Sequence, residues 1–136
     1  MKTAMLMLLL VSAHSKAEEI VCPAELPASA VTVSHAPTGW TGFVPTNLAL
    51  NAVGVTLGPL ADRATLIGDY RKLTHGAYSV TFSLKAAQKH EPWLMCQYGD
   101  SNDIVIAKRL ANTVDTCLVL YTPDTFGGKA IKIKCT

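Results

Sequence analysis

The sequence predicts an all-β fold, namely a small antiparallel β-sandwich or partly open barrel stapled by two disulfides. Residues 78–85 (YSVTFSLK) alternate apolar and polar side chains without a break, which indicates a strand buried on one face. Similar short apolar segments recur roughly every 8 to 12 residues, separated by turns rich in Gly, Pro, Asn and Asp. Four cysteines in a chain that carries an export signal supply the third observation.

The export signal lies at the N-terminus. Lys2 precedes the apolar run of residues 4–11, and Ser15-Lys16-Ala17 forms a small-x-small cleavage site. These features predict a signal peptide over residues 1–17 and a single β domain over residues 18–136, periplasmic or secreted. The apolar run is about half the length that a spanning helix needs, so an uncleaved anchor is disfavoured. Cys22 follows Glu19-Ile20-Val21 rather than a lipoprotein signal, and no membrane association is expected after cleavage.

Most strands are expected in the second half of the chain. Residues 93–98 and 104–106 flank the turn cluster 99–103 as one hairpin, and residues 117–121 and 130–135 flank the turn-rich segment 122–128 as another. Residues 85–90 have room for a single helical turn. In the first half, the Gly58-Pro59 pair ends a long strand and a loop follows. The strands expected there are residues 31–33, 49–57 and 65–73.

The four cysteines, Cys22, Cys96, Cys117 and Cys135, are expected to form two disulfides. No two of them stand in a C-x-x-C pair, so a structural zinc site and a dithiol redox centre both lack support. Three connectivities are possible. A hairpin centred near Phe126 would place Cys117 opposite Cys135 and leave Cys22 to pair with Cys96, which is the arrangement we favour.

Charge disfavours nucleic acid as a partner. The chain has 12 Lys and Arg against 10 Asp and Glu. Loss of Lys2 and Lys16 with the signal peptide leaves ten of each, and the basic residues do not cluster. Lys129, Lys132 and Lys134 near the C-terminus are better explained as the exposed face of a strand that guards a sheet edge.

Several short elements stand out in the mature chain, and the most specific of them is the W-L-x-C-x-Y pattern at residues 93–98. The others are residues 22–27 (CPAELP), 39–40 (GW), 54–55 (GV), 58–66 (GPLADRATL), 117–121 (CLVLY) and 133–135 (IKC). Together these segments resemble a family of short exported proteobacterial proteins of unknown function. The resemblance implies an exported β domain with a cysteine framework, and it transfers no catalytic or ligand residue.

The residues offer little catalytic chemistry. The chain contains no H-E-x-x-H, H-x-H or G-x-S-x-G motif, and no cofactor is expected. His90-Glu91 is the most site-like local cluster. Trp40 and Trp93 are the candidate interaction residues, because exposed aromatic side chains are common anchors of protein recognition. Burial in the core is the alternative for both.

Three functions remain open. The favoured one is a non-enzymatic binding module of the inhibitor or immunity type, with a toxin or a wall hydrolase as its protein partner. The alternatives are a small periplasmic hydrolase, built on His90 and Glu91 or on a dispersed triad, and a structural component of an envelope assembly bound through an exposed sheet edge.

Overall fold

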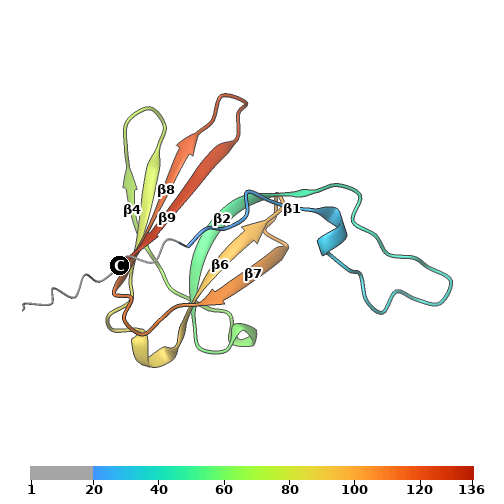
Figure 1. Ribbon diagram of the computed structural model, residues 1–136, viewed down its shortest axis with the longest axis horizontal. Coiled ribbons are helices and arrows are strands. Elements are labelled where there is room, and N and C mark those ends of the chain that lie inside the picture. The colour runs from blue at the N-terminus through green and yellow to red at the C-terminus, as the bar shows by residue number, and fades with distance from the viewer. Residues whose placement is uncertain (1–19) are drawn as a thin grey trace, which may run out of the picture.

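The structure, a computed structural model, describes residues 20–136 and folds them into two antiparallel β-sheets with one hydrophobic core between them (Figure 1). This confirms the all-β sandwich, and the sheets do not close into a barrel. The predicted signal peptide, residues 1–17, and the predicted start of the mature chain at Glu18 lie outside the described residues. In the part of the chain that the structure describes, no helix is long and apolar enough to cross a membrane.

The first sheet has five strands in the order β1-β2-β6-β7, with β3 beside β2. β1 (Glu25–Leu26) and β3 (Ala64–Thr65) are short and pair with the two ends of β2 (Leu48–Leu57). β6 (Pro92–Tyr98) pairs with β2 on one side and with β7 (Ile104–Arg109) on the other. The expected hairpin over residues 93–106 is confirmed, and its second strand extends three residues further than expected.

The second sheet has four strands in the order β4-β5-β8-β9. They are β4 (Asp69–Lys72), β5 (Tyr78–Ser83), β8 (Thr116–Pro123) and β9 (Lys129–Cys135). β9 forms one edge, and Lys129, Lys132 and Lys134 on it are exposed while Ile133 is buried. The predicted lysine-lined edge is therefore present, and these charges oppose pairing with a further strand.

The core forms because each sheet turns an alternating apolar face inward. β6 buries every second residue, and on β5 Phe82 is buried while Tyr78 and Val80 are half-buried against the core, as the alternation in residues 78–85 predicted. Single 3-10 turns connect several strands: η1 (Ala28–Ala30), η2 (Leu60–Asp62) and η3 (Gln88–His90). The third of these occupies the segment expected to hold one helical turn. The core side chains contributed by both sheets include Val53, Val55, Phe82, Leu94, Cys96, Tyr98, Cys117, Val119, Tyr121, Ile133 and Cys135.

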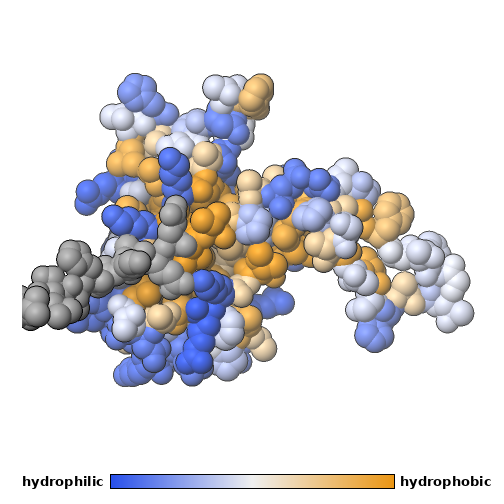
Figure 2. Space-filling model, viewed as in Figure 1, coloured by the Kyte–Doolittle hydropathy of each residue, from blue (hydrophilic) through white to orange (hydrophobic). Residues whose placement is uncertain are grey.

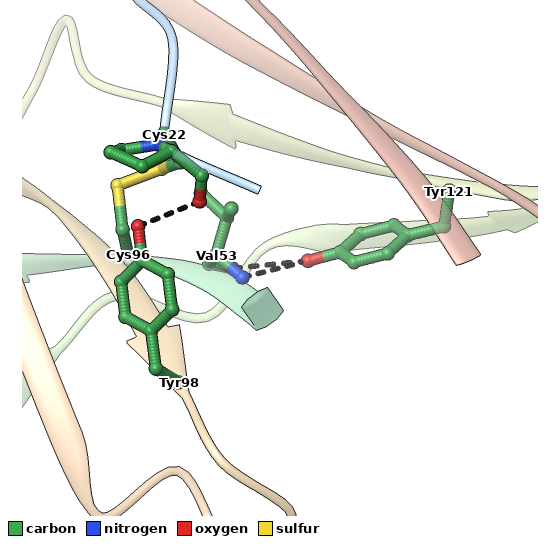
Figure 3. Close-up of a disulfide and its surroundings, with 6 residues drawn as sticks. Cys22, Val53, Cys96, Tyr98 and Tyr121 are labelled. Atoms are coloured by element: carbon green, nitrogen blue, oxygen red, sulfur yellow. Dashed lines mark hydrogen bonds between the residues drawn. A yellow bond between two sulfur atoms is a disulfide. The ribbon is translucent and has the colours of Figure 1, made fainter. Parts of the chain in front are cut away.

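Two disulfides close the structure, Cys22–Cys96 and Cys117–Cys135, in the pairing favoured from the sequence. Cys117 and Cys135 are directly opposite one another on β8 and β9. The other disulfide fastens the segment before β1 to the middle of the first sheet (Figure 3). Next to it, the Tyr98 hydroxyl donates a 2.9 Å hydrogen bond to the carbonyl oxygen of Pro23.

Two strand predictions in the first half were wrong. Residues 65–73 do not form one strand, because the chain leaves the first sheet after Thr65 and enters the second at Asp69. Gly68 lies at this crossing, where a Cβ atom would come within 2.4 Å of Val80 and 2.9 Å of the Phe82 ring. Only glycine lets the backbone pass so close to the core.

Residues 31–33 form no strand either, because no neighbouring strand offers them hydrogen-bond partners. They belong to a long loop between η1 and β2, residues 31–47, which we call the arm. The arm extends away from both sheets (cyan in Figure 1).

Candidate binding surface

A hydroxyl group from the second sheet completes the backbone hydrogen bonding of the first. β1 and β3 pair with the two ends of the same edge of β2 and leave its middle open. There the Tyr121 hydroxyl accepts a 3.0 Å hydrogen bond from the Val53 N–H and donates a 3.3 Å bond to the Val53 carbonyl (Figure 3). Burial raises the pKa of Tyr121, so the hydroxyl stays protonated at neutral pH. This contact joins the second sheet to the middle of β2.

The His90-Glu91 cluster is a surface feature. The Glu91 carboxylate accepts a 2.7 Å hydrogen bond from the guanidinium of Arg109, and both side chains are about half exposed. His90 ends η3, and its backbone carbonyl accepts a hydrogen bond from the N–H of Gly58. Among residues 20–136, no three His, Cys, Asp or Glu side chains gather closely enough to hold a metal ion. Glu91 is thus engaged in an ion pair at the edge of β6 and β7.

The two candidate tryptophans lie in different environments. Trp40 is on the arm, with 76% of its surface exposed. Trp93 is half-buried on the outer face of the first sheet, where its cross-strand neighbours are Thr56 and Arg109. The arm joins β2 at Leu48, whereas Trp93 pairs with Thr56 near the other end of that strand, about 26 Å further along. The structure therefore does not bring the two tryptophans into one patch.

The outer face of the first sheet carries a shallow hollow of about 570 Å³. The side chains of Met95 and Gln97, two of its lining residues, extend over Gly54, and their ends lie 3.3 Å from where a Cβ atom would be. Its lining mixes apolar and polar groups, with Arg63 and Asp103 as the charged ones. The lining residues are Leu60, Arg63, Thr65, Met95, Gln97, Asn102, Asp103, Val105 and Ala107.

The arm exposes three large apolar side chains. Trp40 and Phe43 are each 76% exposed, Val33 is 48% exposed, and no residue between 31 and 47 is buried. In Figure 2 the projecting arm is mostly pale or orange, whereas the blue of hydrophilic residues gathers over the rest of the molecule. The sequence singled out Trp40 from this segment, but it gave no sign of Phe43, because exposure depends on the arm leaving the sandwich.

Comparison with known proteins identifies the family of this chain. Residues 45–136 match the model of the type VI secretion system Tli immunity proteins. The chain belongs to this family. It is accordingly a non-enzymatic binding module of the immunity type, and the hydrolase alternative built on His90 and Glu91 is set aside. No curated protein and no solved structure matches the chain.

Family membership also confirms the coarser part of the resemblance seen in the sequence, since the chain does fall in a recognised family. The individual sequence elements quoted for that resemblance remain predictions. The matched range begins at Pro45, so it includes the strands from β2 onward and three of the four cysteines, but leaves out nearly all of the arm.

Proposed function

We propose that this protein is exported to the periplasm and protects the cell there by binding a toxin of a type VI secretion system. The observation that carries the proposal is the family match, which spans the sandwich from β2 to the last cysteine. An immunity protein that acts by binding needs a stable scaffold and an exposed recognition surface, and it needs no catalytic groups.

The proposed compartment rests on two features of the chain. Both disulfides join residues distant in sequence, by 74 and 18 positions, and such bonds persist in oxidising compartments rather than in the cytosol. The predicted signal peptide over residues 1–17 gives a route to the periplasm. A toxin blocked in this compartment must have a target that is reachable from it, so we propose an envelope-directed toxin, with cell-wall hydrolases as one class.

Co-expression in a bacterial host tests the proposal. Each type VI effector of the strain that carries this gene is directed to the periplasm, alone or together with the full chain. Growth should be restored for one effector by the full chain and not by a variant that starts at residue 18. An unrelated signal peptide fused to that variant should restore protection.

Two outcomes would contradict the proposal. Protection by the variant that stays in the cytoplasm would reject the periplasmic site of action. Failure of the full chain to protect against any effector of the strain would reject the immunity function for this protein.

A further inference from the structure

We propose that the arm, residues 31–47, is the element that recognises the toxin, and that Trp40 and Phe43 insert into an uncharged, apolar cleft of that protein. The inference rests on the proposed function and adds to it a binding site and the chemistry of the surface that the site fits.

The first argument is exposure without any structural benefit. Trp40 and Phe43 each leave 76% of their surface in water, and the arm buries none of its residues against the sandwich. Apolar side chains gathered on one projecting segment are costly in a protein that has no partner for them, because they promote aggregation. Aromatic residues are also the side chains most enriched among binding hot spots.

The second argument is charge. Residues 26–61, which include the whole arm, contain no Asp, Glu, Lys or Arg. A loop that binds an anionic membrane or a nucleic acid normally carries Lys or Arg residues, and this one has neither. A site rich in charges on the partner would lose hydration on contact with the arm and gain no ion pair. The matching surface is therefore an apolar cleft in a protein.

The third argument is that the arm has a defined shape. Its two legs touch where Val33 meets Gly42, since a Cβ atom on Gly42 would lie only 2.4 Å from the Val33 side chain. Near its tip, the N–H of Trp40 donates a 2.9 Å hydrogen bond to the carbonyl of Pro37, and Gly39 adopts a positive φ of 84° within this turn. A loop ordered before binding loses less conformational entropy when it binds.

The base of the arm is fastened as well. The side-chain oxygen of Asn47 accepts a hydrogen bond of 3.0 Å from the N–H of Ala28, and its amide nitrogen donates a 2.6 Å bond to the Glu25 carboxylate. Beyond Asn47, Leu48 and Ala49 pair with β1. The Cys22–Cys96 disulfide holds the chain just before β1 on the core. The sandwich thus presents the arm in a fixed direction.

The fourth argument is that nearly all of the arm lies outside the residues that match the family model. The matched range starts at Pro45, so Trp40 and Phe43 stand outside the part of the chain that the family model describes. Toxins of one delivery system differ from one another, and an element outside the matched sandwich is suited to choose among them. In this assignment the matched sandwich is the scaffold, and the arm selects which toxin is bound.

Binding measurements with the purified toxin identified by the co-expression experiment test this assignment. Trp40→Ala and Phe43→Ala should each weaken the affinity by about 30-fold or more, as expected of hot-spot residues, and the double variant should lose protection in cells. Gly42→Val, which retains both aromatic residues but wedges the two legs apart, should also weaken binding. Calorimetric titration measures the affinities.

Phe126→Ala is the matched control. Phe126 is 96% exposed at the β8–β9 turn, so this variant removes an aromatic residue that is even more exposed than Trp40 and Phe43 from another place on the surface. Its affinity should equal that of the unaltered protein. All five variants should unfold at the same temperature as the unaltered protein, because none of the changed residues belongs to the core. Equal unfolding temperatures show that the variants are folded.

The possible failures are distinguishable. Protection against no toxin overturns the proposed function. Protection and affinity that persist unchanged in the Trp40→Ala/Phe43→Ala variant overturn the arm assignment alone. Sedimentation with vesicles of phosphatidylethanolamine and phosphatidylglycerol covers the alternative that the arm binds lipid: the protein should stay in the supernatant, and pelleting that depends on Trp40 and Phe43 would replace the protein cleft with a membrane surface.

Discussion

Replacing Tyr121 by Phe tests the link between the two sheets with the smallest possible change. The substitution removes one hydroxyl and keeps the ring, which stacks on Tyr78 at 4.5 Å between ring centroids. The hydroxyl makes two hydrogen bonds to the backbone of Val53. Tyr121 is 5% exposed and Val53 is 6% exposed, so water has little access to the groups left behind.

The expected cost follows from those two orphaned groups. A buried donor or acceptor that loses its partner costs about 1–3 kcal/mol, so an unpaired N–H and an unpaired C=O together cost about 2–6 kcal/mol. That is a large share of the roughly 5–15 kcal/mol by which domains of this size are stable. In urea, where the unfolding free energy falls by about 2 kcal/mol per molar denaturant, the midpoint should drop by about 1–3 M.

The assay is equilibrium unfolding in urea without reductant, followed by circular dichroism. Tyr70→Phe is the control, because Tyr70 lies on the edge strand β4 with 64% of its surface exposed, and its loss should change stability by less than about 0.5 kcal/mol. Equal midpoints for Tyr121→Phe and the unaltered protein would show that the hydroxyl does not join the sheets.

Other expected outcomes concern the disulfides, alkaline pH and the surface ion pair. Removing the Cys117–Cys135 bond, which closes a separation of 18 residues, should lower the unfolding free energy by about 3 kcal/mol, measured by urea denaturation of the double serine variant; an unchanged midpoint would contradict this. Burial raises the pKa of Tyr121 above its ordinary value of about 10, so the folded state holds this proton more tightly than the unfolded state. Its contribution is complete below pH 10 and is lost as pH rises through the folded value, so Tyr121→Phe should lose less stability between pH 9 and pH 11 than the unaltered protein, and equal losses would refute the assignment. Glu91→Gln breaks the exposed pair with Arg109 and should cost less than about 1 kcal/mol in the same assay, whereas a larger loss would mean that the pair is structural.

The cysteine framework and the late strands could be predicted because their signals are local. Residues 93–98 are predominantly apolar and end at the turn cluster 99–103, which was enough to predict a strand, and the structure buries Leu94, Cys96 and Tyr98 on one face of it. The hairpin near Phe126 aligned Cys117 with Cys135 by counting from the turn, and the structure pairs these residues directly.

The features that the sequence did not predict depend on contacts between distant segments. The bond from Tyr121 to Val53 joins residues 68 positions apart and exists only because β1 and β3 leave the middle of one β2 edge open. The strand predicted over residues 65–73 was wrong because periodicity cannot show that the chain changes sheets at Gly68. For the arm, alternation of Val and Thr in residues 31–33 suggested a strand, but a strand also needs a partner, and partners are fixed by the whole fold.

Titration of the toxin's activity with this protein tests the central claim most directly, that protection comes from binding and not from catalysis. The purified toxin identified by co-expression is assayed on its own substrate at increasing amounts of the mature protein, at concentrations well above the dissociation constant. The account predicts that activity falls linearly to zero at a small whole-number ratio and returns when the complex is separated. Complete, irreversible loss of activity at a small fraction of that ratio would mean that the protein turns over, and would contradict the account.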